Sequence, residues 1–346
     1  AFGESVQVVG MSATLPNLPQ VADWLNASIF VSDSRPIELA TRVCVGSELR
    51  QLNNCRTGLE KVRHIDSLSP PRQQQQQQQR PPQRQGEKSK DVERRNQGKS
   101  DENVDQSTML ATLCLETTRM NKSVLIFCPT KEWCEKCASM LAECFFKEEV
   151  ERGLNPTTAQ LRREALAALV KTPTGLDQVL HRSVWHGVAY HHSGLTTEER
   201  CVVEDAYRSG AVAVLVCTST LAAGVNLPAA RVIIRSPRVG GGLLSVQSFH
   251  QMCGRAGRLG QSTTGEAILM ARDWELPDAL QLVCGELPPL ESALLSTECS
   301  GLERLFLEMS SCALARKDSD FSQLLECTFL WHQMVGRVPD ESGATT

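Results

Sequence analysis

Two arginines placed among glycines are the residues of this sequence best suited to phosphate chemistry. They are Arg255 and Arg258, in the segment 251–258 that reads Gln-Met-Cys-Gly-Arg-Ala-Gly-Arg. A guanidinium group is planar and permanently charged, and its fork of N–H donors fits the oxygens of a phosphate. An arginine inserted from a neighbouring domain can also stabilise the charge that develops during phosphoryl transfer. The spacing therefore predicts a charge clamp for a nucleoside triphosphate.

The sequence lacks the loop that would hold the phosphates opposite this clamp. Residues 98–100 read Gly-Lys-Ser, like the end of a phosphate-binding loop, but Glu93 stands where such a loop needs its first glycine. Asp101 and Glu102 have no His or Asp at the offset of an acidic magnesium motif. We dismiss both segments as nucleotide sites.

The clamp needs a rigid frame, and the hydrophobic pattern predicts alternating strands and helices. The run at 123–128 is short and continuously apolar, which is typical of a parallel strand buried on both faces. Further strands are predicted at 6–11, 37–45, 187–190, 212–217, 231–235 and 266–271, and helices at 21–25, 130–146 and 159–170. A capping box at 196–199 opens another helix. The alternation indicates a parallel sheet, whose ligands bind beyond the carboxyl ends of its strands.

The composition is that of a packed protein of about two domains. The chain has 346 residues, of which 41% are apolar and 22% charged, and no run of 18 or more apolar residues suggests a membrane span. Fourteen scattered cysteines without a secretory signal favour reduced thiols in an intracellular protein. Cys134 and Cys137 have the spacing of a metal-binding pair, but no second pair follows, so we predict no metal site.

The net charge of −4 gives the chain as a whole no signature of a nucleic-acid-binding protein. A groove needs positive charge only locally, however, and arginines are concentrated in one stretch. This stretch contains Arg231, Arg235, Arg238, Arg255 and Arg258. For Arg231 and Arg238, a solvated basic face is the competing interpretation.

Two segments differ in character from the rest. Residues 70–106 contain seven consecutive glutamines, Gln73 to Gln79, with flanking prolines and dense charge. Such a segment buries too little apolar surface to offset its ordering entropy, so we predict a disordered insertion or linker. Beyond Glu275 the pattern turns helical, at 290–295, 302–309 and 321–330, which could open a winged-helix or other small helical domain.

Four short motifs follow one another along the chain. They read S-A-T at 12–14, H-H-S-G-L at 191–195, T-S-T-L-A-A-G-V-N-L-P at 218–228 and Q-M-C-G-R-A-G-R at 251–258. Together they resemble motifs of superfamily 2 helicases of the Ski2-like group, and in particular the DNA helicases of the Hel308 type. The resemblance covers the chain apart from the glutamine-rich segment and weakens beyond about residue 275.

The resemblance implies a role for each motif. Motif VI at 251–258 would supply the arginine fingers Arg255 and Arg258, with Gln251 as a partner that bridges to the nucleotide site. The positions that approach the nucleotide would be Gly224, Asn226, Gly254 and Gly257. Those that contact nucleic-acid phosphates would be Thr218, Ser219, Thr220, His192, Ser193 and Gly194. Coupling of nucleotide state to strand separation would fall to Ser12, Ala13 and Thr14.

The resemblance also implies an α/β fold, a RecA-like parallel sheet flanked by helices. Residues 1–45 would be the C-terminal tail of a first RecA-like domain, 46–106 a linker with the disordered insertion, 107–274 the second RecA-like domain, and 275–346 the incomplete start of a winged-helix domain. The implied activity is ATP-driven movement in the 3′ to 5′ direction along single-stranded or forked DNA, in the nucleus, with DNA-repair proteins as partners and no membrane. ATP and Mg²⁺ would be bound mainly by an N-terminal lobe that this sequence lacks.

Two interpretations remain open. In the first, the chain is part of a longer, active DNA helicase, and the fragment alone does not hydrolyse ATP. In the second, it is a short product that binds nucleic acid or a partner without any hydrolysis. An RNA helicase of the same group is a further alternative, because those proteins also carry a G-V-N-L-P turn or a G-R-A-G-R motif.

Overall fold

The computed structural model describes residues 7, 9–12, 15–32, 37–53, 58–65, 106–173, 177–222, 225–257, 264–295 and 300–335. The chain divides into two compact units. One unit comprises residues 35–285 and the other combines residues 1–34 with 286–346. Apart from Gln106, the predicted disordered insertion lies outside the described residues.

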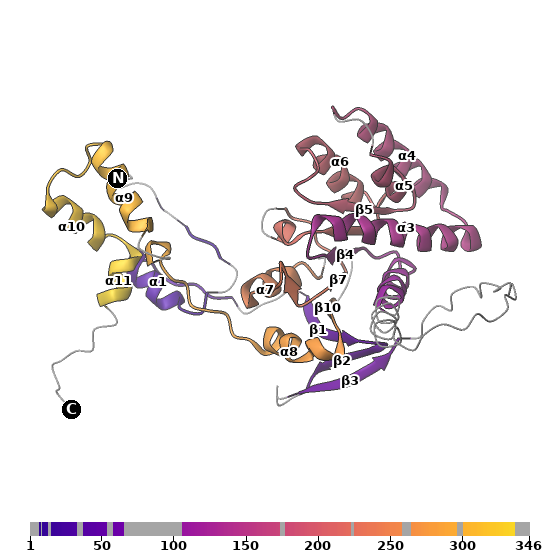
Figure 1. The fold of residues 1–346 in the computed structure, drawn as a ribbon, viewed down its shortest axis with the longest axis horizontal. Helices are drawn as coiled ribbons and strands as arrows, with labels where there is room; N and C mark the ends of the chain where they lie inside the picture. Colours follow the sequence, from indigo (N-terminus) through magenta and orange to yellow (C-terminus); the bar gives the residue numbers. More distant parts are fainter. Residues whose placement is uncertain are drawn as a thin grey trace, which may run out of the picture. The chain divides into compact units, whose positions relative to one another are not determined.

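A sheet forms the frame of the unit 35–285 (Figure 1). In the described part of the chain its strand order is β3-β2-β1-β10-β7-β4-β6-β5. The strands are β1 (Glu38–Val45), β2 (Glu48–Leu52), β3 (Leu59–His64), β4 (Val124–Phe127), β5 (Val188–His191), β6 (Val214–Cys217), β7 (Arg231–Ile234) and β10 (Thr264–Ala271). From β1 to β5 along this order all pairs are parallel, and β2 and β3 add an antiparallel hairpin. This confirms the predicted α/β fold with a mainly parallel sheet.

The central strands are buried on both faces, as their apolar sequences predict. Every residue of β4, β5, β6 and β7 is buried. The helices of this unit are residues 106–118, α3 (Lys131–Arg152), α4 (Pro156–Val170), α5 (Gln178–Trp185), α6 (Thr197–Arg208), α7 (Val246–Cys253) and α8 (Leu276–Cys284). Figure 1 shows α3, α4, α5 and α6 grouped around β4 and β5, with the β2–β3 hairpin at the other edge of the sheet.

Local sequence signals account for several helix starts. Thr130 caps α3, since its hydroxyl accepts a hydrogen bond from the Trp133 amide at 3.2 Å. The predicted capping box before α6 is confirmed: the Thr196 amide donates to Glu199 Oε2 at 2.7 Å, and the Glu199 amide donates to Thr196 Oγ1 at 3.2 Å.

The segment 37–65 differs from the sequence-based expectation. The predicted strand at 37–45 forms as β1, but it pairs with β10 over its whole length and therefore belongs to the same sheet as β4. The residues after it, expected to be linker, form β2 and β3. Val43 and Leu49 are fully buried, so their burial and the backbone pairing fix this segment on the sheet. The strand predicted at 6–11 is not found in the described residues of that segment.

The other unit is helical. Its helices are α1 (Leu18–Leu25), α9 (Ser300–Ser311), α10 (Asp318–Glu326) and α11 (Phe329–Val335), with a 3₁₀ turn, η3, at Ala293–Leu295. The rings of Trp24 in α1 and Phe329 in α11 pack with their centroids 5.1 Å apart, and Trp24 Nε1 donates to the Cys327 carbonyl at 3.0 Å. The helical segments predicted beyond residue 275 are thus present, and α1 packs against them.

Candidate nucleotide and nucleic-acid site

The H-H-S-G-L motif and the motif at 218–228, here called motif V as in the helicases it resembles, lie side by side because the strands before them are neighbours. Strands β5 and β6 pair in parallel, with His191 opposite Cys217 at their carboxyl ends. The Thr218 amide donates to the His191 carbonyl at 3.4 Å. Both loops therefore leave the sheet at the edge where parallel sheets bind their ligands.

Motif VI begins in the last turn of α7, and main-chain contacts join the turn after α7 to Ala229, the residue that follows motif V. Ala229 and Ala256 form a parallel β-bridge. Around it, the Ala229 amide donates to the Arg255 carbonyl at 3.0 Å, and the Gly257 amide donates to the Ala229 carbonyl at 2.7 Å. Buried Phe249 anchors α7 to the core. The structure thus brings together two motifs that are about thirty residues apart in the sequence.

The Arg255 side chain reaches back to motif V. Its Nη2 donates to the Ala222 carbonyl at 2.6 Å, at the end of the 3₁₀ turn η1 (Ser219–Ala222). Arg255 is partly buried, and this burial lowers its pKa below the ordinary value. No carboxylate pairs with it in the described part of the chain. A charged fork with most of its donors unused fits an anionic ligand.

The motif VI turn that presents Arg255 requires a glycine at position 257. Its φ of +99° lies in the left-handed region, and a Cβ added there would lie 2.9 Å from Ile37 Cγ2. The conformation of the turn therefore requires this glycine independently of any nucleotide.

The remaining predicted residues of the nucleotide site are placed as follows. Arg258 and Gly224 lie outside the described residues. Gln251 and Gly254 are exposed at this turn.

His192 shapes the H-H-S-G-L loop from inside. Its side chain is only 3% exposed and stacks on Tyr190, with the ring centroids 5.2 Å apart. The Gly194 amide donates to His192 Nδ1 at 3.1 Å, so Nε2 carries the proton and donates to Glu135 Oε1 at 3.1 Å. Burial lowers the pKa of His192. The neutral ring holds the loop, and the exposed groups are Ser193 and Gly194.

The polar groups of motif V are more open. Thr218 Oγ1 and Thr220 Oγ1 lie 2.9 Å apart, and Thr220 is exposed. Ser219 is partly buried and Asn226 is exposed. Of the S-A-T motif, Ser12 is exposed in the other unit, and Ala13 and Thr14 lie outside the described residues.

Glu135 is a contributor that the sequence did not indicate. It lies on α3, 57 residues before its partner His192, and belongs to none of the four motifs. A carboxylate on a helix surface is usually solvated, so only the spatial contact identifies it.

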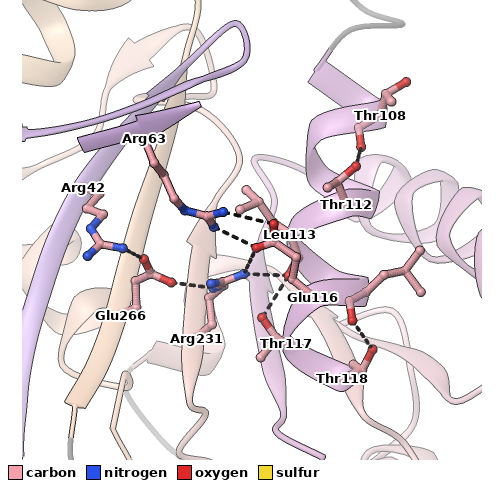
Figure 2. A network of polar contacts seen from close by, with 11 residues as sticks. Arg42, Arg63, Thr108, Thr112, Leu113, Glu116, Thr117, Thr118, Arg231 and Glu266 are labelled. Carbon is pink, nitrogen blue, oxygen red and sulfur yellow. Dashed lines mark hydrogen bonds and ion pairs between the residues drawn. The ribbon is translucent and has the colours of Figure 1, made fainter. Parts of the chain in front are cut away.

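Arg231 belongs to a different structure at the other end of β7 (Figure 2). Its Nε donates to Glu266 Oε2 at 2.6 Å, and its Nη1 lies 3.4 Å from Glu116 Oε2. Glu266 also pairs with Arg42, and Glu116 with Arg63. Arg231 is therefore neither a solvated basic residue nor a groove residue, but the buried centre of a partly exposed ion-pair network.

The two cysteines with metal-like spacing lie in the hydrophobic core of the sheet unit. Cys134 and Cys137 are buried beside Cys128, and a hydrogen bond with Cys134 raises the pKa of Cys128. In the part of the chain that the structure describes, no group of three or more His, Cys, Asp or Glu residues is arranged to hold a metal ion.

Comparison with protein families gives two successive matches along the chain, and the second begins within β10 of the sheet. The helicase conserved C-terminal domain matches residues 157–260, which include motifs V and VI. A helix-turn-helix domain matches residues 265–344, which include α9 to α11. The parallel sheet with these motifs at its carboxyl edge is accordingly a helicase C-terminal domain, and a helix-turn-helix domain follows it.

Individual relatives narrow this class. The chain is 37% identical over 340 residues to DNA polymerase theta of Mus musculus, an alignment that covers 95% of this chain and 12% of that protein. It is 32% identical to the Helicase POLQ-like protein of Homo sapiens, over 98% of this chain and 28% of that protein. It is 28% identical to the ATP-dependent DNA helicase Hel308 of Methanococcus vannielii, over 95% of this chain and 39% of that protein.

The chain belongs to the family of Ski2-like DNA helicases of the Hel308 type. It spans well under half of the length of these relatives. Among the described residues, no helix combines the length and the apolar character needed to cross a bilayer.

Proposed function

We propose that this chain supplies the second RecA-like lobe and the adjoining helical domain of an ATP-dependent helicase that moves 3′ to 5′ along single-stranded DNA. The observation that carries the proposal is the junction of motifs V and VI. Arg255 donates to the Ala222 carbonyl, and the bridge between Ala229 and Ala256 fixes the turn that holds it. A change at the nucleotide is thereby transmitted directly to the loop that contacts DNA.

The proposed nucleotide is ATP with Mg²⁺, which supplies the free energy for strand movement. Arg255 fits such a ligand, since it is a guanidinium without a carboxylate partner in the described part of the chain. We propose that Arg255 and Arg258 contact the phosphates, and that Gln251, Asn226, Gly224, Gly254 and Gly257 line the same site. The chain by itself is proposed to be inactive, because the sequence has no lysine loop for the β and γ phosphates.

The DNA-contacting groups proposed are the exposed parts of two loops. Ser193 and Gly194 come from one loop, and Thr218, Ser219 and Thr220 come from motif V. His192 would act from inside the loop. Ser12, Ala13 and Thr14 remain the proposed coupling motif. Work at replication forks and breaks, a nuclear location and DNA-repair partners are proposals that rest on the relatives alone.

The test uses the full-length protein that contains this chain. Arg255→Ala and Arg258→Ala should each lower DNA-stimulated ATP hydrolysis by about 10³-fold or more, because a finger acts on charge that develops in the transition state. Binding of single-stranded DNA without nucleotide should change less than about 3-fold, a difference well under 1.4 kcal/mol.

Two results would argue against this function. Hydrolysis near the wild-type rate in both variants would remove the finger assignment. A wild-type protein that binds single-stranded DNA but shows no ATP hydrolysis would favour the alternative, a binding protein without motor activity. Stronger stimulation by RNA than by DNA would favour an RNA helicase of the same group.

A further inference from the structure

We propose that Trp133 is a stacking platform for one base of the bound single strand, held in place by Arg235. This inference rests on the proposed function and adds a contact that none of the four motifs contains. It is carried by the position of the indole, its exposure and the charges around it.

Trp133 lies at the ligand-binding edge of the sheet. It is in the first turn of α3, which begins four residues after the end of β4. In the sheet, β4 lies between β7 and β6. The hydrogen bond from its amide to Thr130 Oγ1 fixes this turn. The next residue, Cys134, is buried, whereas the Trp133 side chain is 43% exposed. The fold therefore presents a large aromatic ring on a rigid element at the edge where motif V leaves the sheet.

Arg235 holds the ring and brings an unbalanced charge. Its guanidinium carbon lies 5.8 Å from the centre of the Trp133 ring, within the range of a cation–π contact. Its polar contacts are long, at 3.4 Å to the Gln106 carbonyl and 3.3 Å to Ser107 Oγ. No carboxylate pairs with it among the described residues, although it is only 8% exposed. With respect to the described residues, this buried cation has no counter-ion and therefore contributes a local positive potential.

The surroundings of Trp133 favour a polyanion. Lys131 is exposed and makes no ion pair in the described part of the chain. Its Cδ would lie 3.8 Å from a Cβ placed on Gly194, so its stem runs beside the H-H-S-G-L loop. Of the two acidic neighbours, Glu132 pairs with Lys136, whose Nζ lies 2.6 Å from Glu132 Oε1, and Glu135 accepts the hydrogen bond of His192. A backbone phosphate would meet the exposed Lys131, in the positive potential of the buried Arg235, and a base would stack on the indole.

This arrangement is the usual one for single-stranded nucleic acid, a positive track with aromatic rings that take bases irrespective of sequence. A protein partner would instead be expected to need a wider apolar surface. Here the residues adjacent to the ring in the first turn of α3, Lys131 and Glu132, are both charged. The observations thus favour a nucleic-acid base as the occupant.

The experiment measures binding of the full-length protein, without nucleotide, to two strands of equal length. One is an oligo(dT) of about 16 nucleotides, within the usual range of site sizes, and the other has abasic sites along the same backbone. Trp133→Ala should weaken oligo(dT) binding about 10-fold and leave binding to the abasic strand unchanged, because one stacked base is lost. Trp133→Phe should keep most of the difference between the strands.

Trp185→Ala is the matched control. Trp185 is also 43% exposed, but it lies at the end of α5, before the amino end of β5. Trp185→Ala should leave the affinities for oligo(dT) and for the abasic strand unchanged. If Trp133→Ala and Trp185→Ala lost the same affinity for oligo(dT), the proposal would be overturned. The same preference for oligo(dT) over the abasic strand in the wild-type and Trp133→Ala proteins would also overturn it.

The failures of the two proposals are distinguishable. If wild type binds both strands and hydrolyses ATP but Trp133→Ala behaves like wild type, only the platform is overturned. If wild type binds neither strand, the proposed function and the platform fall together. If Trp133→Ala does not fold, the same two affinities are measured for Trp133→Phe. A phenyl ring can also stack on a base, so loss of the preference for oligo(dT) over the abasic strand in this folded variant would contradict stacking.

Discussion

The two arginines that flank β7 have the same burial and opposite chemistry. Arg231 and Arg235 are each 8% exposed, one at the first position of the strand and one just after its last. Arg231 contacts two carboxylates, Glu266 and Glu116, whereas Arg235 contacts none in the described part of the chain. The charge at the amino end of β7 is therefore paired, whereas the charge at its carboxyl end has no carboxylate partner among the described residues. One end serves stability and the other is suited to an anionic ligand.

The paired end ties together segments that are far apart in the sequence. The network runs from Arg42 in β1 through Glu266 and Arg231 to Glu116 in the helix 106–118 (Figure 2). Arg231 Nη1 also donates to the Leu113 carbonyl at 2.7 Å. A buried ion pair adds little compared with apolar packing, but removing one partner leaves an uncompensated charge. The network should therefore matter most when it is broken on one side only.

The largest expected effect follows from breaking this network. Glu266→Ala removes the carboxylate shared by Arg231 and Arg42 and should lower the free energy of unfolding by about 3 kcal/mol, measured by urea denaturation. Glu48→Ala is the control, because Glu48 pairs with Lys61 and Arg50 near the surface and should cost less than about 1 kcal/mol. Equal losses in the two variants would contradict a special role for the amino end of β7.

The second effect tests whether the motif VI turn requires a glycine at position 257. Gly257→Ala should lower the free energy of unfolding by about 2 kcal/mol, because the residue has positive φ and its Cβ would meet Ile37. Gly210→Ala is the control: Gly210 has a φ of +82° but open space around it, so only the backbone term of about 1 kcal/mol remains. If Gly257→Ala were no worse than Gly210→Ala, the contact with Ile37 would not constrain the motif VI turn.

Groups at the two ends of the parallel strands should also contribute to the free energy of unfolding in different pH ranges. At the carboxyl edge, burial holds the pKa of His192 below its ordinary value of 6.5. The unfolded chain therefore takes up this proton first, and stability present above pH 6.5 is lost as the pH falls through the folded-state pKa. At the amino end, burial alone would raise the pKa of Glu116, but the hydrogen bond from Arg63 and nearby charges hold it below 4.5. Its contribution is present above pH 4.5 and is lost below that value.

Chemical denaturation across pH tests this separation. His192→Gln should flatten the decline below pH 6.5 and leave the acid limb unchanged, whereas Glu116→Gln should do the reverse. His191, whose pKa is also lowered by burial, keeps part of the upper decline in the His192 variant. An upper decline that is identical in wild type and His192→Gln would show that His192 is not the titrating group.

The sequence predicted the features that are local and missed those that depend on distant contacts. The strand at 123–128 and the capping box at 196–199 were predicted correctly, because apolar runs and capping residues act within a few positions. The strand at 37–45 was also predicted, but its pairing with β10 was not, since that partner lies more than two hundred residues further on. The different states of Arg231 and Arg235 could not be predicted either. Two arginines four positions apart look alike until Glu266, Glu116 and Trp133 are placed beside them.

The smallest expected effect concerns the glutamine-rich segment. Deleting Gln73 to Gln79 should change the free energy of unfolding by less than about 0.5 kcal/mol and leave ATP hydrolysis of the full-length protein almost unchanged, because a solvated tract adds little to a core. Thermal unfolding and an ATPase assay check this. The residue that ends the segment, Gln106, contacts Arg235 through its carbonyl. A drop of several degrees in melting temperature would therefore mean that the tract contributes to the carboxyl end of β7, and the contrast between the two ends would have to include it.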